Sequence, residues 1–155
     1  MAFKLSNRSL GKLEGVSEDL VETVKKAIEL TSVDFGVIYG VRSLAEQEKL
    51  FKSGRSQTMK SKHLLQDDGT AHAVDLMAYQ DGQPCWEIQV YDEIADAMKE
   101  AAVREGVKIR WGAAWQIDDL RDWDGTAEEA MNAYIDLRRS QSRRPFIDGP
   151  HFEKN

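Results

Sequence analysis

Cysteine is almost absent from this chain, in which Cys85 is the single one among 155 residues. One cysteine cannot form an internal disulfide, and this usage is consistent with synthesis in a reducing compartment. Cys85 precedes Trp86 and has no histidine near it in the sequence. Because a catalytic thiolate needs a neighbouring base or cation to lower its pKa, we expect Cys85 to be a packed or partly exposed thiol rather than a nucleophile.

Long hydrophobic runs are also missing. No stretch of about 18 apolar residues is present to span a membrane. The N-terminal residues MAFKLSNR lack the apolar core of a signal peptide. We therefore expect a protein that is made and held in the cytoplasm, with no membrane insertion.

An excess of positive charge is absent as well. The chain has 21 Lys and Arg against 27 Asp and Glu, which gives a net charge of −6. Nucleic-acid-binding domains usually carry a basic surface, so nucleic acid is not an expected partner. A chain of this length can bury a core of its own. Since no repeat or linker divides it, we expect one domain over residues 1–155.

The hydrophobic pattern changes its period along the chain. Leu20, Val24 and Ile28 recur at four-residue spacing, which is typical of a helix. Strands separated by helices predict an α+β fold, with an antiparallel sheet flanked by helices. The predicted helices cover 17–30, 43–54, 86–105 and 126–140, the predicted strands cover 33–41, 71–79 and 107–111, a loop covers 53–70, and a last strand lies near the C-terminus.

Histidine is scarce, with only His63, His72 and His151 in the chain. Catalytic zinc commonly takes three His or carboxylate ligands and keeps a fourth position for water. His63, Asp75 and His151 would supply such a set, with Asp148 as the general base. His72 is left out because it lies three residues from Asp75 on a predicted strand, where the two side chains face opposite sides. Spacing alone does not decide the matter, since an Asp and a His often share a segment without binding metal.

Three other residues are candidates for the same site. Arg42 stands where a predicted strand gives way to a predicted helix, a usual place for a side chain aimed into a site. Its alternative is an ordinary surface charge, and Gln47, about one helical turn further on, could equally lie on the surface. Ser61 precedes His63 by two residues and would either fix the local turn or orient the metal site.

A series of motifs occurs in a fixed order along nearly the whole chain. They are Leu5-Ser6-x-Arg8-Ser9-Leu10, Leu13-Glu14-Gly15-Val16, Val33-Asp34-Phe35, Gly40-x-Arg42-Ser43 with Gln47, Ser61-x-His63, Gly69, Ala73-Val74-Asp75-Leu76, Ile109-Arg110-Trp111-Gly112 and Asp148-x-Pro150-His151-Phe152-Glu153. Together they resemble the M15 zinc peptidases, and within them the phage endolysins that cleave L-alanyl-D-glutamate bonds.

Two departures from that family pattern are visible. Twelve residues separate His63 from Asp75, whereas the family usually places its aspartate closer to the first histidine. An insertion around residues 65–69 would explain the difference. The family's usual Trp-Gly-Gly-Asp-Trp reads Trp111-Gly-Ala-Ala-Trp115 here, which changes the local loop without removing a predicted ligand.

The resemblance implies a fold, an activity and a setting. The fold would be that of the Hedgehog and D-Ala-D-Ala peptidases. The activity would be zinc-dependent cleavage of the L-alanyl-D-glutamate bond in peptidoglycan stem peptides during phage-induced host lysis. One catalytic zinc ion, a monomer without a separate wall-binding module, and release by a holin are also implied. Arg42 would bind substrate and stabilise the oxyanion, Gln47 would help to bind substrate, and Ser61 would stand beside the metal ligands.

Two alternatives to this function stay open. One is a D-alanyl-D-alanine carboxypeptidase or dipeptidase of the same fold, which would use the same metal chemistry. The other is a zinc-containing wall-binding module without activity.

An acidic segment suggests a second, regulatory metal ion. Asp122-x-Asp124-Gly125-x-x-x-Glu129 faintly resembles an oxygen-ligand calcium loop, although its spacing is not that of an EF-hand. Some related endolysins bind calcium in this region. The competing interpretation is that these acids cap the helix that follows.

Overall fold

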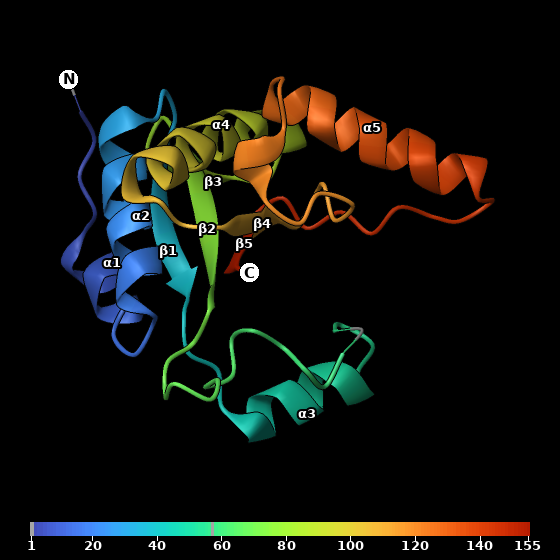
Figure 1. Cartoon of the computed structure of the whole chain (residues 1–155). Coiled ribbons are helices and arrows are strands. Elements are labelled where there is room, and N and C mark those ends of the chain that lie inside the picture. Colours follow the sequence, from blue (N-terminus) through green and yellow to red (C-terminus); the bar gives the residue numbers. More distant parts are fainter. Residues whose placement is uncertain (1, 57) are drawn as a thin grey trace.

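The computed structural model describes residues 2–56 and 58–155 and shows helices packed around a small sheet (Figure 1). In chain order the elements are α1 (Asn7–Lys12), α2 (Glu18–Leu30), β1 (Asp34–Tyr39), α3 (Leu44–Lys52), β2 (Ala73–Gln80), β3 (Gln83–Cys85), α4 (Ile88–Glu105), β4 (Ile109–Trp111), the short 3-10 helix η1 (Leu120–Asp122), α5 (Ala127–Ser140) and β5 (His151–Lys154).

The sheet is antiparallel throughout the described residues. Its strands follow the order β1-β2-β5-β4, and β3 pairs with β2. The predicted α+β fold with an antiparallel sheet flanked by helices is therefore confirmed. Because β5 inserts between β2 and β4, the C-terminal segment reaches the middle of the sheet and lies beside the strand that carries Asp75.

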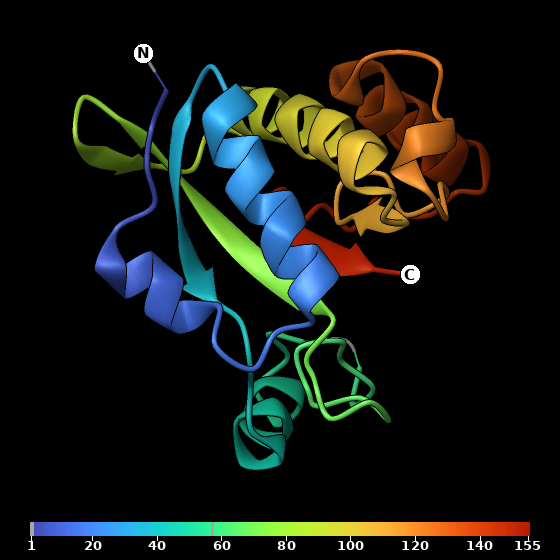
Figure 2. The same cartoon turned by 60° about the vertical axis from the view of Figure 1, so that its left-hand side comes forward.

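A single hydrophobic cluster joins the sheet to α2 and α4. Leu20 of α2, Ile94 and Met98 of α4, and Leu76 and Phe152 of the sheet are fully buried within it. Figure 2 shows α2 lying across the sheet, while α3 and the loop after it extend beyond one end of the strands. None of the helices in the described ranges is long and apolar enough to cross a membrane. The core therefore supports the sheet, and α3 with its loop forms a separate wall beside it.

Three short elements, α1, β3 and η1, were not predicted. β3 forms because Asp81 and Gly82 have positive φ values of 52° and 76°, so they make a two-residue hairpin turn rather than a simple strand end. The six residues of α1 are too few to show a helical period, and Ser6 caps the helix by accepting a hydrogen bond from the Ser9 N–H. The other elements lie where they were predicted, and their ends differ from the predicted ones by at most two residues.

Asp92 on α4 makes the stability of this fold depend on pH. Burial raises the pKa of its carboxyl to about 6, helped by the negative charges of Glu128, Asp96 and Glu93. Its Oδ1 atom is buried without a hydrogen-bond partner among the described residues. The folded chain therefore holds a proton here more tightly than the unfolded chain does. As pH rises from about 4 through 6, that proton is lost and the free energy of unfolding falls.

We expect Asp92→Asn to raise the free energy of unfolding by about 1 to 2 kcal/mol at pH 7, because it removes the buried charge. The difference should disappear below about pH 4, where the carboxyl is protonated in both states. Urea unfolding of both proteins at the two pH values measures this. An equal effect at both values would show that charge is not the cause.

Candidate active site

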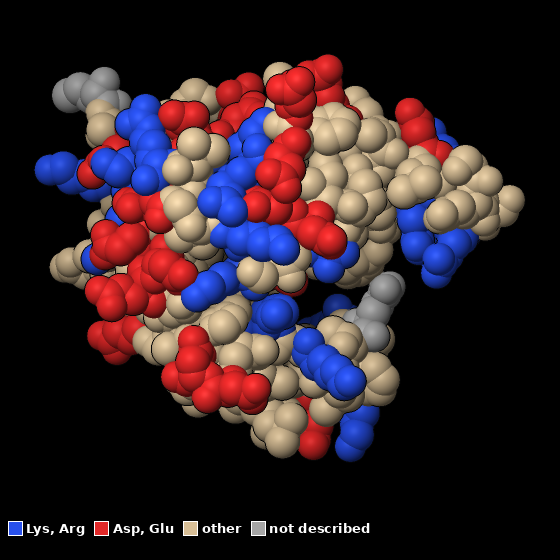
Figure 3. Space-filling model, viewed as in Figure 1, with Lys and Arg blue, Asp and Glu red and all other residues tan. Residues whose placement is uncertain are grey.

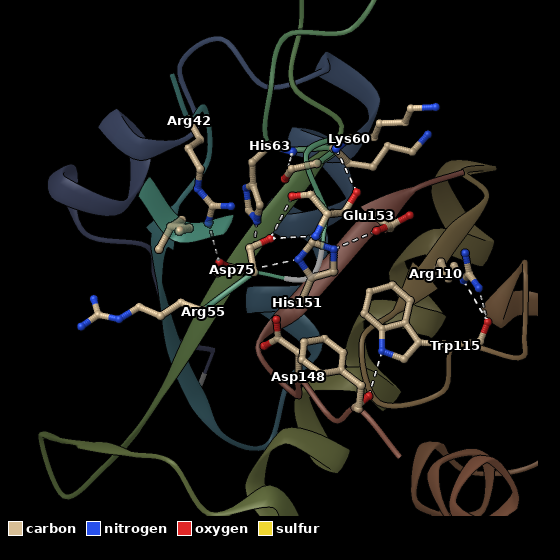
Figure 4. A pocket seen from close by; sticks show the side chains of 16 residues that line it. Arg42, Arg55, Lys60, His63, Asp75, Arg110, Trp115, Asp148, His151 and Glu153 are labelled. Atoms are coloured by element: carbon tan, nitrogen blue, oxygen red, sulfur yellow. Dashed lines mark hydrogen bonds and ion pairs between the residues drawn. The ribbon is translucent and has the colours of Figure 1, made fainter. Parts of the chain in front are cut away.

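Three of the predicted site residues meet where β2 and β5 pair. The register of these strands places Asp75 directly opposite His151. His63 lies in the loop after α3. The Arg42 N–H, just after β1, donates a hydrogen bond to the His63 carbonyl at 2.8 Å and so holds this loop beside β1. One ligand atom from each of His63, Asp75 and His151 lies within 4.8 Å of the other two (Figure 4). Such a cluster could hold one metal ion.

The second nitrogen of each histidine is already engaged. His63 Nδ1 donates to the Gly40 carbonyl at 2.8 Å, and His151 Nε2 donates to Glu153 at 2.8 Å. A neutral imidazole has a single N–H, so in neutral rings His63 Nε2 and His151 Nδ1 would keep the lone pairs that can bind a metal, whereas in protonated rings the same two nitrogens would donate to Asp75. These two atoms lie 3.2 and 3.1 Å from Asp75 Oδ1. Hydrogen bonds such as those to the Gly40 carbonyl and to Glu153 commonly fix the ring orientation of metal-binding histidines.

The electrostatics of the cluster favour a bound cation. Burial alone would raise the pKa of Asp75, but hydrogen bonds from His151 and His63 outweigh it and lower the pKa. Burial would lower the pKa of His151, yet its hydrogen bonds to Asp75 and Glu153 raise it to about 10. The carboxylates of Asp75 and Glu153 therefore favour a positive charge between them.

Asp148 lines the same pocket but lies outside the three-residue cluster. Burial raises the pKa of its carboxyl above the ordinary value, and the negative charge of Asp75 raises it further. Its backbone is fixed by a hydrogen bond from the Asp148 N–H to the Gly112 carbonyl at 2.8 Å. Only glycine fits at position 112, since an added Cβ would lie 2.3 Å from the Asp148 carbonyl oxygen. A carboxyl with a raised pKa beside a metal cluster is suited to general acid–base chemistry.

Arg42 and Gln47, at the start of α3 and on α3 itself, are joined by a hydrogen bond between their side chains. The Arg42 guanidinium points to Asp75, with Nη2 and Oδ2 3.9 Å apart, and its Nη1 donates to Gln47 Oε1 at 2.8 Å. Gln47 is fully buried and does not line the pocket. Its Nε2 donates to Ser56 Oγ at 2.8 Å and to the Thr58 carbonyl at 2.5 Å. Contact between Gln47 and a substrate stays a prediction. Because Gln47 is buried outside the pocket and accepts a hydrogen bond from Arg42, its position supports a role in orienting the Arg42 side chain.

We expect Gln47→Ala to lower the free energy of unfolding by about 1 to 3 kcal/mol, because it leaves buried hydrogen-bonding groups without partners. Glu48→Ala is the matched control, since Glu48 is exposed on the same helix and should change stability by less than about 0.5 kcal/mol. Urea unfolding of both variants gives the comparison. Equal stability of the two would show that the Gln47 amide does not support this wall.

Ser61 and His72 both lie outside the metal-binding cluster. Ser61 Oγ accepts a hydrogen bond from the His63 N–H at 3.1 Å, which fixes the local turn, the first of its two predicted roles. His72 Nε2 lies 2.9 Å from Asp68 Oδ2, and His72 does not belong to the metal-binding cluster, in agreement with the strand argument.

The additional residues between His63 and Asp75 form a closed excursion. The His72 N–H donates to the Lys62 carbonyl at 2.8 Å, and the Gln66 N–H donates to the Thr70 carbonyl at 2.8 Å. Between them Leu65 and Ala71 form an antiparallel bridge. The spacing between His63 and Asp75 is therefore accommodated in a turn outside the pocket, and the insertion around residues 65–69 stays a prediction.

Three of the pocket residues without a role predicted from the sequence are linked to His151, either directly or through one aromatic ring. Glu153 follows His151 by two residues on β5, so both side chains emerge on one face, and this alternation could have indicated the contact. The Trp115 ring lies 5.5 Å from the His151 ring and 6.3 Å from that of Phe146. Nothing in the spacing of Trp115 and Phe146 signalled this contact, because they come from loops far apart in sequence.

The acidic segment gives no support to a calcium site. The Glu129 carboxylate accepts hydrogen bonds from the Thr126 backbone and hydroxyl, so it caps α5. The Lys99 ammonium donates to the carbonyls of Trp123 and Gly125, so these two backbone oxygens of the segment already have a positively charged partner. In the described part of the chain, the cluster of His63, Asp75 and His151 is the one group of this kind. The capping interpretation therefore explains Glu129.

Comparison with known proteins places this arrangement in a family. The chain matches the phage L-alanyl-D-glutamate peptidase family over residues 1–154. It belongs to that family. The L-alanyl-D-glutamate peptidase of Escherichia phage T5 is 29% identical over 119 residues, which cover 74% of this chain and 83% of the relative. The crystal structure of the Serratia marcescens L-Ala D-Glu endopeptidase ChiX matches with a TM-score of 0.72 and 30% identity, over 99% of this chain and 91% of that one.

Membership in the phage L-alanyl-D-glutamate peptidase family confirms the resemblance carried by the motifs. The likeness to ChiX over nearly the whole chain also confirms the predicted Hedgehog/D-Ala-D-Ala peptidase-like fold. Where the family usually has Gly and Asp, this chain has Ala113 and Ala114, and both are fully buried. Both methyl groups belong to the hydrophobic core, and neither residue is one of the predicted ligands.

Proposed function

We propose that this protein is a zinc-dependent endopeptidase that hydrolyses the L-alanyl-D-glutamate bond of peptidoglycan stem peptides. The observation that carries the proposal is the cluster of His63, Asp75 and His151 in one pocket with Asp148. The relatives named above are L-alanyl-D-glutamate peptidases, which supports the same bond as the substrate.

The residues of the cluster fit zinc. Two imidazole nitrogens and one carboxylate oxygen match the ligand set of catalytic zinc sites. Calcium and magnesium prefer sites built from oxygen ligands, which this cluster does not provide. The hydrogen bonds to the Gly40 carbonyl and to Glu153 orient the two rings, as expected for metal-binding histidines. Zinc would be held by His63 Nε2, His151 Nδ1 and a carboxylate oxygen of Asp75.

The catalytic roles follow from charge and position. When bound, zinc supplies a Lewis acid that polarises the scissile carbonyl and makes the attacking water more acidic. Asp148 accepts the proton of that water and passes it to the departing amine of D-glutamate. Arg42 donates hydrogen bonds to the developing oxyanion, for which its permanent charge and fixed donors are suited. Gln47 holds the Arg42 side chain in place.

Mass spectrometry of digested peptidoglycan tests this function. Zinc-loaded protein should release stem peptides with a new N-terminal D-glutamate, and these peptides should be absent from a chelated control. Release of terminal D-alanine would instead assign the protein to the D-alanyl-D-alanine carboxypeptidases. Binding of wall fragments without cleavage by the zinc-loaded protein would favour the non-catalytic module.

A further inference from the structure

His151 is a predicted metal ligand that lines an open pocket. Figure 3 shows the hollow between α3 with its loop and the rest of the molecule. Hydrogen bonds to Asp75 and Glu153 hold the two ring nitrogens of His151. These bonds act at the edge of the imidazole, so they restrain a tilt of the ring out of its own plane only weakly. A firm orientation therefore needs packing against the ring itself.

Two aromatic rings provide this packing. The His63 ring centre lies 5.2 Å from that of His151 at an interplanar angle of 68°, and the Trp115 ring centre lies 5.5 Å away at 34°. In Figure 4 these two rings lie on opposite sides of His151. Both distances are those of favourable contacts between aromatic rings. Since His63 is itself a predicted ligand, Trp115 is the one of the two that packs against His151 from outside the cluster.

Trp115 is itself held by two neighbours. Its indole Nε1 donates to the Phe146 carbonyl at 3.0 Å, and the two rings stack with their centres 6.3 Å apart. The Arg110 guanidinium donates to the Trp115 carbonyl and lies 5.2 Å from the Trp115 ring centre. Arg110 belongs to β4 and stands opposite Glu153 in the pairing with β5. The strand that carries His151 is therefore paired with the strand that holds Trp115.

A platform for the substrate is the alternative role for Trp115, because its side chain also lines the pocket. The two roles differ in what they affect. A substrate platform changes KM and leaves the metal in place. A residue that orients a metal ligand changes metal affinity as well as activity. The direct contact between the Trp115 and His151 rings favours the second role.

We propose that Trp115 is a positioning residue for the metal site, and that its ring keeps His151 in the orientation that aims Nδ1 at zinc. The inference rests on the proposed zinc site and does not depend on which bond the enzyme cleaves. Glu153 restrains His151 at Nε2, and Trp115 restrains the tilt of the ring. Trp115 thus contributes to zinc affinity without supplying a ligand atom.

The zinc affinities of three variants test the proposal, each measured by competition with a chromophoric chelator. Trp115→Ala should raise the zinc dissociation constant by about 10- to 100-fold, the usual effect of losing a residue that orients a metal ligand. Trp115→Phe keeps an aromatic ring and should stay within about threefold of wild type. Trp86→Ala is the matched control, since Trp86 is 59% exposed and does not line the pocket, and it should leave zinc affinity unchanged.

Cobalt substitution separates positioning from a general loss of structure. The visible absorption of bound cobalt depends on the geometry of its ligands. At saturating cobalt, Trp115→Phe should reproduce the wild-type spectrum, whereas Trp115→Ala should show shifted bands. Circular dichroism checks that the variants are folded, and Trp115→Leu, which keeps more apolar volume, replaces Trp115→Ala if the alanine variant does not fold.

The outcomes separate the inference from the proposed function. Wild-type zinc affinity and an unchanged cobalt spectrum in Trp115→Ala would overturn the positioning role, and a rise in KM alone would make Trp115 a substrate contact. Failure of the proposed function looks different, because zinc binding would still weaken in Trp115→Ala while wild type cleaved no L-alanyl-D-glutamyl peptide. Wild-type protein that binds no zinc would overturn the zinc site and this inference together.

Discussion

Replacing Asp148 with alanine should lower kcat on an L-alanyl-D-glutamyl peptide by about 10²- to 10⁴-fold, the usual contribution of a general acid–base group. Zinc content should stay at wild-type level, because the Asp148 carboxylate is not part of the His63–Asp75–His151 cluster. The measurement is kcat together with the zinc-to-protein ratio of the same desalted sample. Loss of turnover with zinc retained would separate the base from the metal ligands.

Asp136→Ala is the matched control for this prediction. Asp136 is an exposed acid on α5 and does not line the pocket, so its loss should leave kcat unchanged. A near-normal rate for Asp148→Ala would remove Asp148 from the mechanism. Loss of zinc from that variant would instead show that the carboxylate supports the metal site.

Replacing His151 with alanine should remove both zinc and activity. Losing a residue that only orients a metal ligand typically lowers metal affinity by 10- to 100-fold, and losing the ligand itself costs more. We therefore expect a zinc-to-protein ratio near zero after desalting and a residual rate below about 1% of wild type. Circular dichroism should show that the fold is kept, which ensures that the loss is local.

The third histidine provides an internal control. His72 lies on the neighbouring segment but pairs with Asp68 outside the cluster. His72→Ala should therefore keep both zinc and turnover. Zinc loss in His72→Ala, or zinc retention in His151→Ala, would contradict the assigned ligand set.

Local features of this fold were predictable because they depend on residues close in sequence. The capping boxes of Ser43 with Glu46 and of Thr126 with Glu129 begin α3 and α5 within one residue of the predicted starts. Gly106 ends α4 in the left-handed conformation. At the two capping boxes side chains satisfy backbone groups of the first turn, and at Gly106 the missing side chain allows the left-handed conformation that ends the helix. Each of these features depends on residues within a single turn.

Features that depend on distant contacts could not be derived in this way. Eighty-eight residues separate His63 from His151, and only the order of the family motifs indicated that they meet. The pairing of β2 with β5 brings Asp75 and His151 together, and no local pattern encodes that register. The position of Gln47 was missed for the same reason, since its partners Ser56 and Thr58 belong to a loop without periodic structure.

The closed excursion between His63 and Asp75 allows the length of this segment to change without changing the positions of the two ligands. Its ends are joined by the hydrogen bond from His72 to Lys62, and its tip, around the exposed Gly69, lies away from the pocket. Residues can therefore be added to or removed from the tip without moving the two ligands that flank it. The same property makes the tip a suitable insertion point for a foreign peptide, such as an affinity tag or a wall-targeting sequence, in a variant that keeps its chemistry.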